Sequence, residues 1–92
     1  MRRENGRLLL SGPVTLANVG EVLAEGRRLL ADGAATVDLA EVSELDSSAL
    51  ALLLAWLREA RAAGRTLAFA NVPAALRTIA RLYGVEALLP AV

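Results

Sequence analysis

The fold is decided by residues 37–57, which read VDLAEVSELDSSALALLLAWL. A short apolar strand over 35–39 leads into a polar turn, the turn ends in Asp46-Ser47-Ser48, and a helix begins at once. Serine is favoured at a helix start because its oxygen accepts a hydrogen bond from a free backbone N–H of the first turn. The helix dipole also favours an added negative group there. The stretch therefore predicts two surface hydroxyls beside the end of a strand, which suit a switch or a docking site and fit no obvious catalytic centre.

The helix that follows is apolar on every side over residues 49–57. A helix on the surface of a small domain normally has one apolar face, so a helix that is apolar all round must be covered on both sides. The predicted sheet covers one side. The other side is either covered by neighbouring helices or forms a partner interface, which Trp56 favours because tryptophan is enriched at binding hot spots. The candidate partner-binding residues are Ser47, Ser48, Ala49, Leu50, Leu53 and Trp56.

The whole chain alternates strands and helices. Asn5-Gly6 predicts a tight turn between a first strand near 2–4 and a second strand at 7–11, which Gly12-Pro13 ends. The candidate caps of a helix over 19–30 are Thr15 and Asn18, and Asn18 has capping-box spacing with Glu21. The next predicted elements are the strand 35–39, the helix 47–63 and the strand 65–70. A third helix is predicted to begin near Pro73, with its inner face at Leu76, Ile79, Ala80 and Tyr83. The tail at 85–90 is expected to dock as a last strand or turn. This order predicts a single α/β domain over 1–92 with a largely parallel or mixed sheet.

The composition excludes several classes of function. The 92 residues include no Cys and no His, and all ten basic residues are Arg, which removes the commonest metal ligands, the commonest general base and a Schiff-base lysine. We therefore expect no enzyme, no metal site and no cofactor. A formal charge of zero and few aromatic residues argue against nucleic-acid binding. The longest apolar run is 49–57, whereas a membrane span needs about 20 residues, so we expect a cytoplasmic protein without direct membrane insertion.

Three segments resemble the STAS domain, the fold of anti-sigma factor antagonists and of the cytoplasmic tails of sulfate transporters. They are Gly12 with the helix after it, the pattern Asp38-Leu39-x-x-Val42-x-x-Leu45-Asp46-Ser47-Ser48-x-Leu50, and residues 67–72. The leucine-rich helix at 49–54 and the ending at 76–90 are similar to MlaB-like proteins, the small STAS subunits of bacterial phospholipid-transport ABC complexes. The resemblance covers essentially the whole chain. It implies a mixed, mostly parallel sheet of four to five strands with three to four helices.

The resemblance also implies a non-enzymatic subunit that binds the cytoplasmic ATPase of the transporter. The ATPase would hold it at the inner membrane, with the permease as an indirect partner. The position implied to contact the ATPase matches Ser47. The serine that is phosphorylated in anti-sigma factor antagonists matches Ser48, which leaves that function open as the alternative, and Ala49 stands where both groups have Gly. Asp46 has no His or basic clamp nearby in sequence, so we expect it to cap the turn. A homodimer of the free chain through the apolar helix also stays open.

Overall fold

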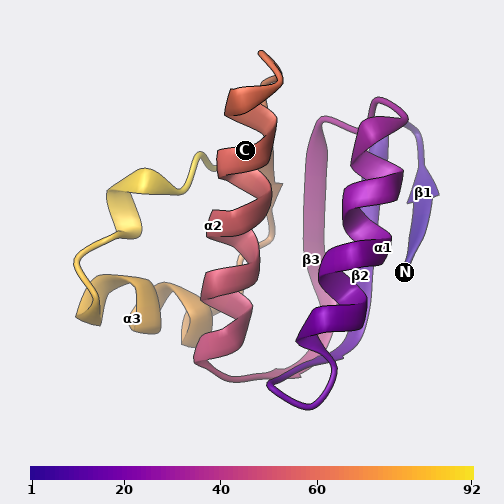
Figure 1. Cartoon of the computed structure of the whole chain (residues 1–92). Coiled ribbons are helices and arrows are strands. Elements are labelled where there is room, and N and C mark those ends of the chain that lie inside the picture. The colour runs from indigo at the N-terminus through magenta and orange to yellow at the C-terminus, as the bar shows by residue number, and fades with distance from the viewer.

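The computed structural model of the chain describes residues 1–92 and consists of a four-stranded sheet with helices packed on one face (Figure 1). The strands are β1 (Arg2–Glu4), β2 (Arg7–Val14), β3 (Thr36–Leu45) and β4 (Ala68–Ala70). The helices are α1 (Val19–Ala31), α2 (Ser47–Ala62) and α3 (Ala74–Leu82), and a short 3-10 helix, η1 (Glu86–Leu88), follows them. The predicted order of strands and helices is confirmed.

The sheet is mixed and mostly parallel, as predicted. β1 pairs antiparallel with β2, whereas β3 runs parallel to both β2 and β4. Asn5 and Gly6 have positive φ angles of 51° and 78°, which are typical of the type I′ turn in a two-residue hairpin. The C-terminal tail lies along the opposite edge. There the Phe69 N–H donates to the Pro90 carbonyl at 2.8 Å and the Val92 N–H donates to the Phe69 carbonyl at 3.1 Å. The tail therefore docks as predicted, and the structure places it beside β4.

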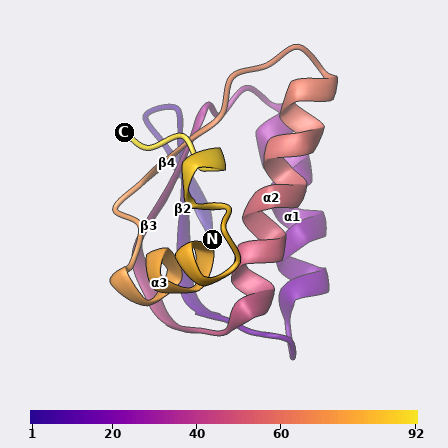
Figure 2. The same cartoon turned by 90° about the vertical axis from the view of Figure 1, so that its left-hand side faces the viewer.

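The core lies between the sheet and the helices. Alternate residues of β2 and β3 are buried, which is the period of two expected of strands with one covered face. Figure 2 shows α1 and α2 side by side on that face. The largest fully buried side chains are Trp56, Phe69, Leu8, Leu10, Leu52, Leu53, Leu76, Val14 and Val37. They come from β2, β3, β4, α2 and α3, so one core joins the sheet to the helices.

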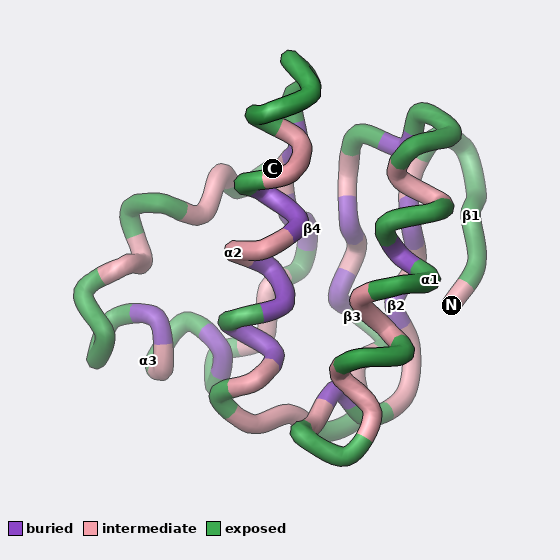
Figure 3. Tube along the Cα trace, in the orientation of Figure 1, coloured by how far each residue is buried: buried purple, intermediate pink, exposed green.

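α2 is covered on both sides by the chain itself. α1 packs along one side and α3 along the other, and six residues of α2 are buried. Buried and exposed positions alternate along this helix in Figure 3. Within the apolar run 49–57 only Ala51 is exposed, while Leu54 and Ala55 are half-buried. Neighbouring helices therefore account for the apolar character of α2.

Three local predictions are wrong. β2 does not end at Gly12-Pro13 but continues to Val14, because Gly12 takes a positive φ of 79° at an irregularity in the pairing with β3. Pro13 is tolerated there since β1 pairs only with the first residues of β2, which leaves the outer edge of β2 unpaired beside Pro13.

Asn18 makes no side-chain capping hydrogen bond to α1. Tyr83 is 66% exposed and does not belong to the inner face of α3.

Two strands also differ in length from the predicted ranges. β3 extends beyond residue 39 to Leu45, because the longer β2 offers it pairing partners up to Val14. β4 begins only at Ala68, and residues 65–67 precede the ladder with β3. The longer β3 ends immediately before the turn into α2, which fixes where that helix begins.

Candidate functional site at the start of α2

Asp46 connects the start of α2 to the loop between β2 and α1. It is the N-cap of α2, and its Oδ1 accepts hydrogen bonds from the Ser48 backbone N–H at 2.9 Å and from the Ser48 hydroxyl. Its Oδ2 accepts from the Leu16 backbone N–H at 2.9 Å. The Ser48 hydroxyl is the main cause that holds the pKa of Asp46 below its ordinary value, and the N–H groups of Leu16 and Ser48 act in the same direction. One carboxylate thus fixes two segments that are far apart in sequence.

This corner of the molecule is suited to binding more than to catalysis. A carboxylate with a lowered pKa is a weak base near neutral pH, so Asp46 is poorly placed to activate the Ser48 hydroxyl as a nucleophile. No group of acidic side chains lies close enough together to hold a metal ion. None of the helices combines the length and the apolar character that a membrane crossing requires. The geometry is that of a rigid surface with a defined shape.

The two serines of the site have different surroundings. Ser47 is exposed, whereas Ser48 is half-buried and its hydroxyl donates to Asp46. A phosphate on Ser48 would remove that hydrogen bond and would place about −1.5 to −2 charges beside the Asp46 carboxylate. Ser47 is therefore the more accessible of the two serines, while a chemical change at Ser48 would act through Asp46.

Four of the six predicted contact residues are buried, namely Ala49, Leu50, Leu53 and Trp56, with exposed fractions of 4, 5, 1 and 1%. They are buried because α1, α3 and the sheet surround α2. The indole Nε1 of Trp56 also donates to the Leu23 carbonyl of α1 at 3.2 Å, so this residue joins two helices. Next to Ser47, the residues that α2 presents to solvent are Ala51, which is exposed, and Leu54, which is half-buried.

Leu16 is an exposed apolar residue of the site that the sequence patterns did not reveal. Its side chain is 79% exposed. The surrounding loop is held by Asn18, whose Oδ1 accepts from the Thr15 N–H at 2.9 Å and whose Nδ2 donates to the Pro13 carbonyl at 2.9 Å. Together with Asp46, these bonds fix the backbone from which Leu16 projects. Leu16 lies before α1 and outside its helical pattern of apolar residues. The one sequence signal for it is that a large apolar residue stands alone in a predicted loop.

A second polar cluster lies on the sheet face away from the helices, around Asp38. Its Oδ1 accepts from Asn71 Nδ2 at 3.0 Å and from the Ala40 N–H at 2.9 Å, and its Oδ2 accepts from Arg7 Nη1 at 3.2 Å. The hydrogen bond from Asn71 is the main cause that lowers the pKa of Asp38, and the bonds from Ala40 and Arg7 add to it. This carboxylate joins β2, β3 and the residue after β4, which is a structural role.

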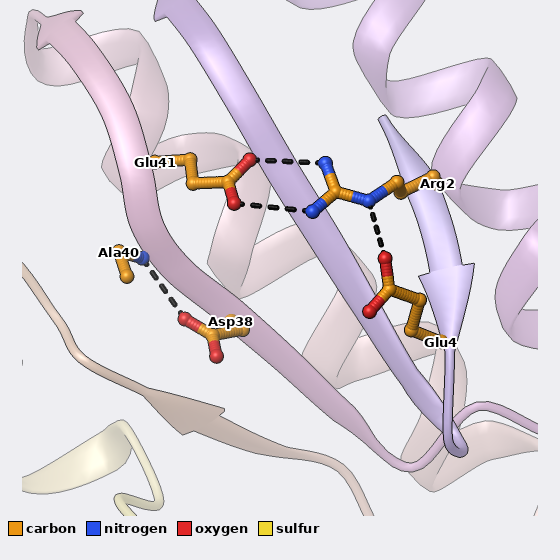
Figure 4. Close-up of polar contacts among 5 residues, drawn as sticks. All are labelled: Arg2, Glu4, Asp38, Ala40 and Glu41. Carbon is orange, nitrogen blue, oxygen red and sulfur yellow. Dashed lines mark hydrogen bonds and ion pairs between the residues drawn. The ribbon is translucent and has the colours of Figure 1, made fainter.

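Arg2 makes the other polar contacts on this face (Figure 4). Its guanidinium donates to both carboxylate oxygens of Glu41 at 3.1 and 3.2 Å and to Glu4 at 2.6 Å. These contacts tie the short strand β1 to β3 across β2. All three side chains are about half exposed, so these ion pairs contribute little to stability.

Comparison with known proteins identifies the family. The family profile described as Mlab, STAS domain, matches residues 1–90. The solved structure of the anti-sigma factor antagonist SpoIIAA in its unphosphorylated form is similar to this chain with a TM-score of 0.69 and 21% identity, covering 94% of this chain and 77% of that chain. A sulfate transporter family protein from Wolinella succinogenes is similar with a TM-score of 0.66 and 15% identity, covering 97% and 75%. No curated protein matches significantly.

The two structural neighbours show the fold, since their sequences are too different to show more. The mixed four-stranded sheet with three helices corresponds to the fold of SpoIIAA. STAS domain families are generally non-enzymatic, which agrees with the binding geometry around Asp46. The family profile covers nearly the whole sequence, and this chain therefore belongs to the MlaB-type family of STAS domains.

Proposed function

We propose that this chain is a non-enzymatic subunit that binds the cytoplasmic ATPase of a phospholipid-transport ABC complex and is held at the inner membrane by that partner. The family supports the choice of partner, because the Mlab profile matches residues 1–90 and the resemblance to MlaB-like proteins implies a STAS subunit of such a complex. The rigid corner around Asp46 supports a role in recognition. If this chain binds only the folded ATPase, its binding shifts the folding equilibrium of the ATPase toward the folded form that can assemble.

The docking surface that we propose consists of Leu16, Ser47, Ala51 and Leu54. Ser47, Ala51 and Leu54 are spaced by four and three residues, so they share one face of α2. Leu16 is next to this face because the Asp46 carboxylate accepts hydrogen bonds from both the Leu16 N–H and the Ser48 N–H. The exposed Leu16 on a fixed loop is the observation that carries the proposal. A surface that is already ordered loses little conformational entropy on binding.

Affinity purification of the tagged chain from its native host tests the partner. An ABC ATPase and its permease should be recovered with the wild-type chain and identified by mass spectrometry. Leu16→Asp should reduce their recovery by about tenfold or more, because an unpaired carboxylate buried at an interface costs well over 1.4 kcal/mol. Ser43→Asp is the matched control, since Ser43 is exposed on β3 and lies outside the docking surface.

Two outcomes would contradict this function. Recovery of a sigma-factor regulator in place of the ATPase would overturn the choice of partner. An equal loss of the ATPase with Leu16→Asp and with Ser43→Asp would show that the added charge acts generally, which would overturn the choice of surface.

The alternative is an anti-sigma factor antagonist that is switched by phosphorylation of Ser48. The observation that favours it is the hydrogen bond from the Ser48 hydroxyl to Asp46, in a fold similar to that of SpoIIAA. In this case Ser48→Asp abolishes partner binding and Ser47→Asp does less. If the chain binds an ATPase through its docking surface, Ser47→Asp has the larger effect. The two variants compared in the same purification therefore separate the two functions.

A further inference from the structure

A small pocket opens between the C-terminal halves of α1 and α2, at the opposite end of α2 from Asp46. Its volume is about 200 Å³. The floor is apolar and includes Trp56, Leu67 and Ala34, all of which are buried. The rim includes Ala31 and Ala63, which are exposed. The pocket is therefore an apolar hollow with access from solvent.

The pocket is open in the structure, and several of its walls are short or held in place. Four of the lining residues are alanines, Ala31, Ala34, Ala60 and Ala63, whose side chains cannot reach across the space. Trp56 cannot swing into it, since the indole packs directly on Gly26 and its Nε1 donates to the Leu23 carbonyl at 3.2 Å. A ligand thus enters without any need for the core to open.

The rim carries one positive charge that no carboxylate of the chain neutralises. Arg27 binds both oxygens of Glu59 at 2.7 Å, so these two charges cancel. Arg65 makes no ion pair and donates one N–H to the Leu30 carbonyl at 2.8 Å. Its other N–H groups stay available, and a guanidinium is well suited to bind a carboxylate with two of them. The electrostatics at the rim therefore favour a ligand with a single negative charge.

We propose that this pocket binds a medium-chain aliphatic carboxylate, with the chain on the apolar floor and the carboxylate on Arg65. The size of the pocket sets the chain length. An engineered apolar cavity of about 150 Å³ accepts benzene, so about 200 Å³ accommodates a chain of roughly six to eight carbons. The site shares no residue with the docking surface, so it stands or falls independently of the proposed function.

Trp56 provides the measurement, because it is the one tryptophan of the chain and it lines the pocket. Its fluorescence is followed while the full chain is titrated with butanoate, hexanoate, octanoate and dodecanoate, each below its micelle concentration. A saturable change is expected, with the affinity rising about fourfold per added methylene until the pocket is full. Octanoate and dodecanoate should then differ little. No saturable change with any of them, or a steady rise through dodecanoate as in general adsorption, would overturn the proposal.

Two matched pairs of variants locate the site. Arg65→Ala should weaken octanoate binding about tenfold, because a charged hydrogen-bonded contact is lost, and should leave binding of neutral 1-octanol unchanged. Arg28→Ala, on an exposed arginine of α1 that does not line the pocket, should change neither. Ala63→Leu should abolish binding by filling the rim, whereas Ala62→Leu, one residue earlier and outside the pocket, should not. Equal effects within either pair would place the ligand elsewhere and refute the assignment.

Discussion

The contact between Gly26 of α1 and Trp56 of α2 leaves no room for a methyl group, which makes Gly26→Ala a direct test of the helix packing. An added Cβ would lie 2.6 Å from Cε2 and 2.9 Å from Cη2 of the indole, and closer still to Cζ2. Ordinary contact begins at 3.4 Å, so the contact with Cε2 alone requires the ring and the helix to separate by about 0.8 Å (3.4 less 2.6), and the closer contact with Cζ2 requires more. The indole cannot shift freely, because its Nε1 is bonded to the Leu23 carbonyl.

Opposing contributions determine the size of the effect. Overpacking of a core costs about 1–3 kcal/mol, and loss of the indole hydrogen bond costs about 1 kcal/mol. Alanine is favoured over glycine inside a helix by about 1 kcal/mol, which offsets part of this. The net expected loss of unfolding free energy is about 1–3 kcal/mol, and the melting temperature of a domain of this size should fall by about 5–20 °C.

Urea and thermal unfolding, followed by circular dichroism, measure the difference. Gly20→Ala is the control in the same helix, because a Cβ at Gly20 meets nothing within 4 Å. It should leave stability unchanged or raise it by up to about 1 kcal/mol. If Gly26→Ala proves as stable as Gly20→Ala, the close contact between the two helices does not exist in solution and the packing argument fails.

Two further predictions concern the site and the core. Asp46→Ala should destabilise the domain through loss of the cap and of the bond to Leu16. The folded-state pKa of Asp46 is lowered, so this contribution is present above its unfolded pKa of about 3.9 and is lost as the pH falls through the folded value. In urea unfolding, the gap between wild type and variant should therefore shrink from pH 7 to pH 3, and a constant gap would contradict the role of the carboxylate. Leu53→Ala, at a 1% exposed position, should cost about 2–5 kcal/mol. Leu82→Ala, at an 81% exposed position, should change the unfolding free energy by less than about 0.5 kcal/mol, and similar losses for the two would refute the assignment of core and surface.

The fold was predictable because its signals are local and agree with one another. The Asn5-Gly6 turn and the alternation of strands with helices lie within short windows of sequence, and both are found in the structure. The errors arise where distant neighbours decide. Whether Pro13 can remain in a strand depends on how far β1 extends beside it, and the exposure of Tyr83 depends on where the chain turns after α3.

The site was only partly predictable for the same reason. The position of Asp46, Ser47 and Ser48 at a helix start follows from residue types alone. The bond from Leu16 to Asp46 joins residues on separate loops, and no spacing pattern reports it. The burial of Leu50 and Trp56 depends on the cover that α1 and α3 provide, which an apolar run cannot distinguish from a partner interface.

The parallel pairing of β2 with β3 and of β3 with β4 has a consequence for folding kinetics. The hairpin of β1 and β2 closes in microseconds, but two strands alone are only marginally stable. Each parallel pair instead spans an intervening helix, α1 in the first and α2 in the second. Closing these long loops loses chain entropy before core contacts compensate for it. We therefore expect the rate-limiting step to be the assembly of two βαβ units around their shared strand β3, with little contribution from the β1 hairpin to the barrier.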